Sequence, residues 1–352
     1  RGSLGISGRP LDAGLAKAQQ LDVKQGAYVM QVMDDSAASE AGIKAGDVII
    51  SIDGSEISGD DNSIGNNQIG GIPGIDLGNV TAENLFPEIR ALFEEHSAIL
   101  FRRQQLTPEK HMELARLFGP IEDRYADERK PGEAMKISEV SNVRDDGTTS
   151  DEMDLHTLHL KSNFLWHSDS TFLPVPALVN ILTAQIVPDQ GGATELASTR
   201  AAWADMPKAL KEKINGRGIW HRYSHSRRQI SEELSKLPMF NKWPDQHWAS
   251  VWQNPINGRK APYLASHAFS IDGYDDAQSQ QILADLIAFC TQPQFVYAHD
   301  WAVGDVLLWD QRAVMHRGTP WPFDQPRKLT SLCSSVRDTD GLPDMRLSGA
   351  PA

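Results

Sequence analysis

The stretch LWHSDSTF, residues 165–172, places a histidine and an aspartate two positions apart directly after a leucine and a tryptophan. Its apolar flanks are typical of a buried strand, and we expect one here. Histidine and aspartate are both good metal ligands. On its own, the pair His167 and Asp169 would more often be an ordinary polar pair on a strand, so a metal site needs a third ligand.

The chain has 11 histidines, and His316 has the most convincing setting for that third ligand. It follows the strand-like run GDVLLWDQRAVM and precedes RGTPW, which predicts a turn. Two histidines and one carboxylate on a β scaffold are what a non-haem iron(II) site with open coordination positions requires. Three protein ligands on one face leave the opposite face free for a chelating co-substrate and dioxygen.

A chelating keto acid has a far carboxylate, and the planar fork of an arginine matches a carboxylate in two places. Arg327 opens the run RKLTSLCSSV after His316, where the chain is expected to return on the next strand. Thr194, in GGATEL, could donate a hydroxyl hydrogen bond to the same carboxylate.

Four segments, LWHSDSTF, VPDQGGATEL, GDVLLWDQRAVMHRG and QPRKLTSL, together resemble the taurine / 2,4-dichlorophenoxyacetate dioxygenase family of iron(II)- and 2-oxoglutarate-dependent oxygenases. The resemblance covers about residues 72–340. It implies that His167, Asp169 and His316 bind iron, and that Thr194 and Arg327 bind the 2-oxoglutarate C5 carboxylate. The implied reaction uses dioxygen to hydroxylate a small organic acid, aryloxyalkanoate- or sulfonate-like, with succinate and carbon dioxide as co-products. Cleavage of a C–O or C–S bond can follow.

The substrate side of the site is less well defined by this resemblance. Asn163 matches a family asparagine between co-substrate and substrate, although hydrogen bonding in the core or in a turn is nearly as good an interpretation. Many members carry a second arginine where this chain has Ser331. Arg227 and Arg228, in WHRYSHSRRQI, are our candidates to supply the missing charge to the substrate.

Strand-like runs with Gly and Pro turns predominate from residue 164 onward, which predicts a mixed β fold with a double-stranded β-helix (jelly roll) core and surrounding helices. Helices are expected over residues 83–96, 108–118, 199–215 and 276–290. Residues 121–163 show no periodicity, and we expect a cover loop there. The expected division is a dioxygenase domain over 75–340 and a tail over 341–352.

Residues 1–58 resemble the first PDZ domain of an HtrA/DegP-type serine protease, with Ser3–Ile6 as the carboxylate-binding loop. The resemblance stops near Ile57, before the helix and strand that complete a peptide groove, so we expect a partial PDZ-like unit in which peptide binding is doubtful. Residues 59–74, rich in Gly, Asn and Asp, are expected to be a linker. A peptide-binding adaptor with an idle oxygenase domain is the rival hypothesis.

The formal net charge of −13 argues against broad attraction to nucleic acid or to an anionic membrane. Two cysteines cannot form a disulfide framework or a Cys-rich zinc site. No signal-peptide pattern is seen, so a cytoplasmic location is expected. The oligomeric state is left open, with a homo-oligomer among the expected forms. His156 and His159 have the spacing of a zinc pair, but a variable loop is the favoured interpretation of their surroundings.

Overall fold

The protein is described by a computed structural model that falls into two compact units, residues 1–75 with 98–100 and residues 76–97 with 101–352. The described residues are 6–11, 16–17, 19, 21, 23, 26–33, 36–40, 42–49, 51–52, 55–56, 75–151 and 154–347. The expected linker, residues 59–74, lies outside them, as do Ser3–Gly5 of the PDZ-like loop and the last five residues of the tail.

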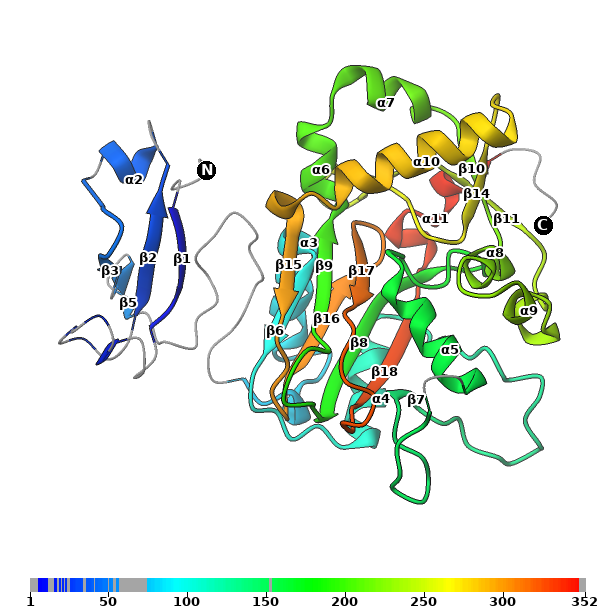
Figure 1. The fold of residues 1–352 in the computed structure, drawn as a ribbon, viewed down its shortest axis with the longest axis horizontal. Coiled ribbons are helices and arrows are strands. Elements are labelled where there is room, and N and C mark those ends of the chain that lie inside the picture. Colours follow the sequence, from blue (N-terminus) through cyan, green and yellow to red (C-terminus); the bar gives the residue numbers. More distant parts are fainter. Residues whose placement is uncertain are drawn as a thin grey trace. The chain divides into compact units, whose positions relative to one another are not determined.

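The smaller unit contains a three-stranded antiparallel sheet in the order β1-β2-β3, the hairpin β4-β5 and the short helix α2 (Figure 1). Val29 and Ala38 form its core with three partly buried aliphatic side chains. Its elements are β1 (Ile6–Pro10), β2 (Ala27–Val32), α2 (Ala37–Glu40), β3 (Val48–Ile49), β4 (Ser51–Ile52) and β5 (Ser55–Glu56).

The rest of the described chain is built around two antiparallel sheets, a five-stranded sheet in the order β6-β16-β8-β18-β7 and a three-stranded sheet in the order β15-β9-β17 (Figure 1). Together they are the jelly roll predicted from the sequence. Their strands are β6 (Ala98–Phe101), β7 (Ser138–Ser141), β8 (Ala177–Ile186), β9 (Thr194–Ser198), β15 (Val296–His299), β16 (Val306–Asp310), β17 (Val314–Gly318) and β18 (Lys328–Ser335).

Smaller sheets and helices surround this core. The remaining strands are β10 (Gly218–His221), β11 (Gln246–Ala249), β12 (Val251–Gln253), β13 (Lys260–Pro262) and β14 (Ala268–Ile271). The α-helices are α3 (Phe86–His96), α4 (Pro108–Phe118), α5 (Leu155–Lys161), α6 (Thr199–Asp205), α7 (Lys208–Ile214), α8 (Tyr223–Arg228), α9 (Glu232–Ser235), α10 (Asp276–Cys290) and α11 (Leu342–Met345). The 3₁₀ turns are η1 (Leu77–Asn79), η2 (Ser162–Phe164), η3 (Pro238–Phe240), η4 (Pro293–Phe295) and η5 (Asp338–Asp340).

Strand β8 shows why the sequence forms this core. Its first eight residues, ALVNILTA, are all buried, as expected for a strand with neighbours on both edges and cover on both faces. Helix α4 covers one face: His111 hydrogen-bonds the Ile181 carbonyl at 3.0 Å, and the Ser334 hydroxyl donates to the Ala115 carbonyl at 2.7 Å. The opposite face therefore remains to line the interior of the jelly roll.

Three local predictions were wrong. Residues 165–172 do not form a strand: His167 makes one β-bridge to His316, and the chain then turns, with Ser170 in the left-handed region at φ 62°. Helix α3 begins at Phe86 instead of residue 83, because the Asn84 side chain accepts from the Thr81 backbone N–H at 2.7 Å and holds a turn there. Residues 121–163 contain β7 and α5, which gain their order from pairing with β18 and from burial of Thr157 and Leu160.

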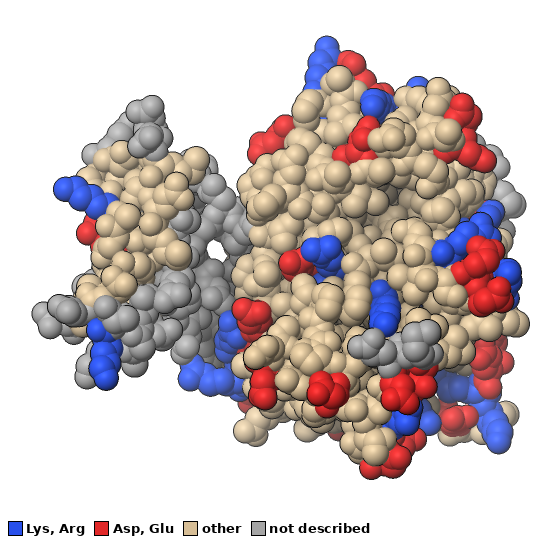
Figure 2. Space-filling view, in the orientation of Figure 1, with Lys and Arg blue, Asp and Glu red and all other residues tan. Residues whose placement is uncertain are grey.

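No described helix combines the length and the apolar character needed to cross a lipid bilayer. On the face shown in Figure 2, basic and acidic side chains of the larger unit are interspersed. Several cationic side chains lie inside this unit instead, and their partners distinguish two roles for them.

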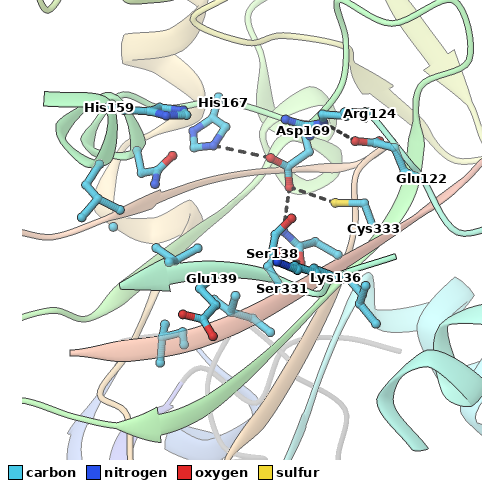
Figure 3. A pocket seen from close by; sticks show the side chains of 18 of the residues that line it. Glu122, Arg124, Lys136, Ser138, Glu139, His159, His167, Asp169, Ser331 and Cys333 are labelled. Carbon is cyan, nitrogen blue, oxygen red and sulfur yellow. Dashed lines mark hydrogen bonds and ion pairs between the residues drawn. The ribbon is translucent and has the colours of Figure 1, made fainter. Parts of the chain in front are cut away.

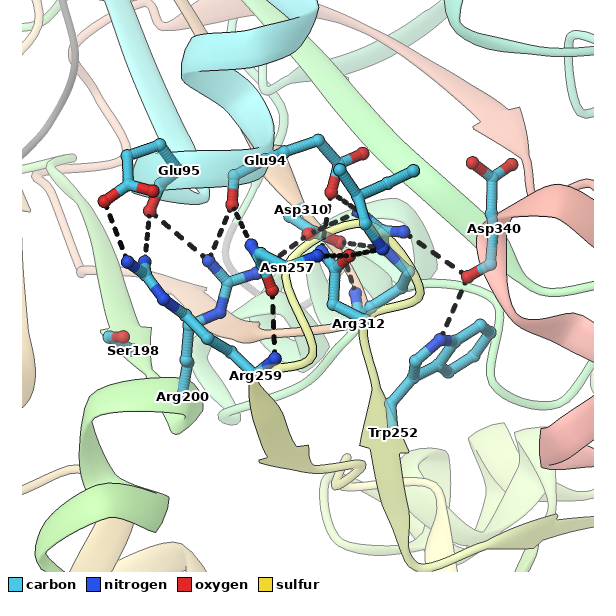
Figure 4. Close-up of polar contacts among 12 residues, drawn as sticks. Glu94, Glu95, Ser198, Arg200, Trp252, Asn257, Arg259, Asp310, Arg312 and Asp340 are labelled. Atoms are coloured by element: carbon cyan, nitrogen blue, oxygen red, sulfur yellow. Dashed lines mark hydrogen bonds and ion pairs between the residues drawn. The ribbon is translucent and has the colours of Figure 1, made fainter.

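Arg312 is a buried arginine with a structural role. Its side chain is 1% exposed, and it contacts Asp310 at 2.9 Å and Glu94 at 2.8 Å. Burial opposes the charged form, but the Asp310 and Glu94 carboxylates outweigh burial and hold the Arg312 pKa above its usual value. Arg90 extends this network by pairing with Glu94 and Asp340. Arg200 extends it to Asp310 and to the Glu94 backbone carbonyl (Figure 4). The contact between Asp310 and Arg312 is thus one part of a larger buried network.

Replacing Arg312 by methionine keeps most of the side-chain volume but removes the cation that the buried Asp310 and Glu94 carboxylates share, and leaves them only their contacts with Arg200 and Arg90. We expect Arg312→Met to lower the free energy of unfolding by about 3–5 kcal/mol in a urea titration. Arg259→Ala, which removes an exposed contact with Glu95, is the control and should cost no more than about 1 kcal/mol. Equal losses in the two variants would contradict a structural role for the buried network.

Candidate metal centre

His167, Asp169 and His316 come together as the sequence analysis predicted. Each offers one ligand atom, and the three atoms lie within 4.8 Å of one another. The Nε2 atom of His167 is 3.7 Å from Asp169 Oδ1, and the Nε2 atom of His316 is 3.6 Å from Asp169 Oδ2. Among the described residues, this is the one group of histidine, cysteine or acidic side chains placed to share a metal ion.

The backbone fixes the two histidines against each other. His316 N–H donates to the His167 carbonyl at 2.7 Å, and His167 N–H donates to the His316 carbonyl at 3.0 Å. The His167 ring then hydrogen-bonds through Nδ1 to the Leu165 carbonyl at 2.7 Å. Because Nδ1 must carry the proton in that bond, Nε2 is left with a free lone pair, which is the form that a metal ligand needs.

The Asp169 carboxylate is oriented by two amides. Figure 3 shows this carboxylate facing His167, with Cys333 on its other side. Gln311 Nε2 donates to Asp169 Oδ2 at 2.7 Å, while its amide oxygen accepts from the Asp169 backbone N–H at 2.8 Å. Asn180 Nδ2 donates to the same carboxylate oxygen at 2.8 Å. Ser331 in turn donates to Asn180 Oδ1 at 2.9 Å, so the serine at the family's arginine position supports Asp169 indirectly.

Burial sets the protonation states of the three residues. It lowers the pKa of His316 to about 3, an effect to which His167 adds and which Asp169 opposes. It lowers the pKa of His167 as well, again against Asp169. Burial raises the pKa of Asp169, but His316, His167, Arg124 and the hydrogen bond from Asn180 together outweigh burial, and the pKa falls to about 2. At neutral pH the site therefore presents two neutral imidazoles and a carboxylate, the forms that bind metal.

These residues open into a cavity of about 560 Å³ between the two sheets. Thr194 on β9 and His316 on β17 line it from one sheet, and Asn180 on β8 and Ser331 on β18 line it from the other. Aromatic side chains supply much of the apolar wall: Phe164, Phe172, Tyr223, Trp309 and Trp321. A volume of this size accommodates a small molecule together with a chelating co-substrate.

Arg327 is 3% exposed and lines this cavity, with no carboxylate partner among the described side chains. It donates to the Gly192 carbonyl from Nε at 3.1 Å and from Nη2 at 2.9 Å, and it lies over the Trp321 ring. Burial lowers its pKa to about 10, so the side chain stays charged at neutral pH. Gly192 has φ +70°, and a Cβ there would lie 2.9 Å from Arg327 Nε, so glycine is needed for this approach.

Thr194, at the start of β9, lines the same cavity and is 3% exposed. Its Oγ1 accepts a hydrogen bond from the Trp301 indole N–H at 3.0 Å. An indole can only donate, so the Thr194 hydroxyl keeps its own hydrogen for a ligand in the cavity.

The donor set fits iron(II) and 2-oxoglutarate. Two imidazoles and one carboxylate suit a non-haem iron centre with open positions. A buried guanidinium without an acid and a free hydroxyl hydrogen in the same cavity suit the far carboxylate of a dicarboxylic keto acid. Both groups line the same cavity as the metal-ligating residues, which a chelating co-substrate requires.

The structure separates the remaining predicted residues. Asn163 and Arg227 line the cavity. Arg228 does not: it is exposed and pairs with Glu232 at 3.1 Å, so its predicted substrate role was wrong. Adjacent residues on a helix point in different directions, and α8 therefore turns Arg228 outward where Arg227 turns inward. His156 and His159 do not form a zinc pair, because His156 bonds the Ser141 carbonyl and His159 bonds Arg227.

Sequence reasoning missed four residues of the site: Asn180, Gln311, Trp301 and Arg124. Asn180 carried a usable signal, since it is a lone amide within the apolar run ALVNILTAQIV. Gln311 directly follows a buried strand but has no distinguishing spacing. Arg124 lines the cavity, donates to Ser170 Oγ at 2.9 Å and pairs with Glu122, in a segment whose sequence shows no periodicity.

Comparison with known proteins agrees with this geometry. The family model "Taurine catabolism dioxygenase TauD, TfdA family" matches residues 60–333, and a PDZ domain model matches residues 2–70. The alpha-ketoglutarate-dependent 2,4-dichlorophenoxyacetate dioxygenase of Cupriavidus pinatubonensis is 32% identical over 262 residues, which cover 74% of this chain and 91% of that protein. The (S)-phenoxypropionate/alpha-ketoglutarate-dioxygenase of Sphingobium herbicidovorans is 33% identical over 249 residues, covering 68% and 82%.

A solved structure, AAD-2 in complex with Mn(II) and N-oxalylglycine, superposes with a TM-score of 0.71 at 29% identity, covering 78% of this chain and 96% of that one. The chain belongs to the taurine catabolism dioxygenase TauD, TfdA family. It is an iron(II)- and 2-oxoglutarate-dependent dioxygenase, and the rival interpretation as a peptide-binding adaptor with an idle oxygenase domain is not supported.

The two amides that hold Asp169 generate a prediction. Gln311→Met keeps nearly the same side-chain volume but removes the two hydrogen bonds that Gln311 makes with Asp169. The carboxylate is then held by Asn180 alone, and its orientation is less fixed. We expect the affinity for Mn(II), measured by calorimetric titration, to fall roughly 10- to 100-fold. Gln229→Met, which removes a hydrogen bond from outside the cavity to the Ser266 carbonyl, is the control. Unchanged Mn(II) affinity in Gln311→Met would show that Asp169 does not depend on Gln311.

Proposed function

We propose that His167, Asp169 and His316 ligate iron(II) in this chain, and that Arg327 and Thr194 hold the C5 carboxylate of 2-oxoglutarate beside it. The observation that carries this assignment is the opening of both groups into one cavity: three ligand atoms within 4.8 Å and a buried guanidinium without an acid. The stability of the fold does not explain Arg327, because a buried arginine without an acid costs free energy.

When bound, iron(II) supplies the redox chemistry that couples oxidative decarboxylation of 2-oxoglutarate to hydroxylation of the substrate. The protein's own contribution is positional. Gln311 and Asn180 hold the Asp169 carboxylate, the Leu165 carbonyl fixes the His167 ring, and Arg327 fixes the far end of the co-substrate. The aromatic wall formed by Phe172, Tyr223 and Trp309 keeps water from the face on which the substrate binds.

The proposed substrate is a small organic acid, aryloxyalkanoate- or sulfonate-like. The two similar enzymes named above act on 2,4-dichlorophenoxyacetate and (S)-phenoxypropionate. The aromatic side chains that line the cavity suit an aryl group, which packs favourably against rings. If the hydroxylated carbon carries an ether oxygen, the product is a hemiacetal, which collapses with cleavage of the C–O bond.

Succinate release tests the proposed function. The intact chain should form succinate only when iron(II) and 2-oxoglutarate are both present, and His167→Ala should abolish this activity because one metal ligand is missing. His247→Ala is the matched control, since His247 pairs with Asp272 away from the cavity. Equal succinate release from the wild type and His167→Ala would refute the enzymatic assignment.

Arg327 permits a second test that separates co-substrate from metal. We expect Arg327→Met to raise the KM for 2-oxoglutarate about 10- to 100-fold, since a charge-assisted contact with the carboxylate is lost. Mn(II) affinity should stay unchanged, because the arginine contacts none of the three ligands. Arg317→Gln, on β17 and paired with Glu195, is the control. A parallel loss of Mn(II) affinity in Arg327→Met would mean that its effect is structural.

A further inference from the structure

Four arginines line the cavity, and their partners divide them into two pairs. Arg124 is paired with Glu122, and Arg129 is paired with Asp123. Arg227 and Arg327 have no carboxylate partner among the described side chains, although both are more than nine-tenths buried. A buried cation without a counter-charge is costly, and such a cation in a ligand cavity indicates an anionic ligand. The co-substrate accounts for Arg327, which leaves Arg227 unexplained.

The surroundings of Arg227 leave part of its guanidinium free. Nη1 donates to Ser226 Oγ at 2.8 Å, and Nη2 donates to Tyr223 Oη at 3.1 Å and to His159 Nε2 at 3.2 Å. Nε is buried and has no hydrogen-bond partner. Since a guanidinium has five N–H hydrogens, three of them are used here and two remain.

Neighbouring groups add to this donor set. The Tyr223 hydroxyl accepts from Arg227, so its own hydrogen is available to a ligand. Burial, together with the nearby charges of Arg227 and Arg124, lowers the pKa of His159 to about 3. The imidazole beside Arg227 is therefore neutral at neutral pH and does not add a charge. Arg227 is therefore the charged member of this group, and Tyr223 is the neutral donor.

Contacts between aromatic rings connect this group to the metal-ligating residues. The Arg227 guanidinium lies 4.4 Å from the centre of the Tyr223 ring, and Tyr223 stacks on Phe172 at 3.7 Å with the planes 5° apart. His267 is 5.8 Å from Tyr223 and 6.2 Å from His167, measured between ring centres. Arg227 is thus separated from a metal ligand by two rings, a span that a small acid can bridge.

We propose that Arg227, with the Tyr223 hydroxyl, binds the anionic group of the organic substrate and takes the place of the arginine that this chain lacks at Ser331. The inference rests on the proposed function and specifies its substrate as an anion. Ser331 cannot fill that role, because its hydroxyl already donates to Asn180. The site takes a carboxylate, sulfate or sulfonate, whose oxygens accept from N–H and O–H donors alike.

Binding measurements can isolate this site from the co-substrate site. The full chain is loaded with Mn(II) and N-oxalylglycine, so that the metal and Arg327 are occupied and no turnover occurs. Calorimetric titrations then compare 2,4-dichlorophenoxyacetate, 2-phenoxypropionate and an alkyl sulfate with the neutral amide or alcohol of each. We expect at least one anion to bind the wild type about 10- to 100-fold more tightly than its neutral analogue.

Arg227→Gln should abolish this preference and leave the affinity for N-oxalylglycine unchanged. Arg228→Gln is the matched control on the adjacent residue, outside the cavity, and should retain the preference. Tyr223→Phe preserves the ring stack and should reduce the preference about 3- to 10-fold, which keeps the test valid if Arg227→Gln unfolds.

Three results would overturn the inference: a wild type that prefers none of the three anions, an Arg227→Gln variant that keeps the preference, or an Arg227→Gln variant that loses N-oxalylglycine to the same extent. The proposed function fails separately, when wild-type protein does not bind N-oxalylglycine in the presence of Mn(II). In that case the same anion titrations on the full chain without N-oxalylglycine still report on Arg227.

Discussion

The site depends on one short backbone contact, the pair of hydrogen bonds between His167 and His316. These residues are far apart in the sequence, and one of them lies outside any strand. The bridge sets the separation of the two imidazoles to 4.2 Å between ring centres, and Asp169 then needs only a turn after His167 to face both of them. Because backbone hydrogen bonds are independent of the side chains, ligand geometry is fixed before any metal binds.

Buried charge in the larger unit has two distinct uses. Arg312 is enclosed by Asp310 and Glu94, so the structure satisfies its charge internally and the network contributes to the fold. Arg227 and Arg327 are buried to a similar degree but lack such partners among the described residues. Their charge is left for ligands that enter the cavity. The difference between the two uses lies in the acids placed around each arginine, and it cannot be judged from burial alone.

Much of the fold and of the metal site could be predicted from the sequence, because the decisive residues lie in segments with clear local character. Helices α4 and α10 follow their apolar periodicity, and Thr107 caps α4 as its sequence indicates. His167, Asp169, His316, Thr194 and Arg327 lie in segments whose order resembles a known family. The order within residues 121–163 escaped prediction, because β7 is held by pairing with β18 and Arg124 reaches the cavity from a segment without periodicity.

The sequence by itself determined the residue types of the metal site and the strand that carries His316, since metal chemistry restricts the ligands to a few side chains and strands have a recognisable composition. Only the tertiary structure decided which arginine faces the cavity. Arg227 and Arg228 are adjacent and chemically identical, yet the rotation of one residue along α8 buries the first in the cavity and pairs the second with Glu232 in solvent. The tertiary structure also showed that Ser331 supports Asp169 through Asn180. The hydrogen bond between Ser331 and Asn180 joins the neighbouring strands β18 and β8, so it exists only after these strands pair.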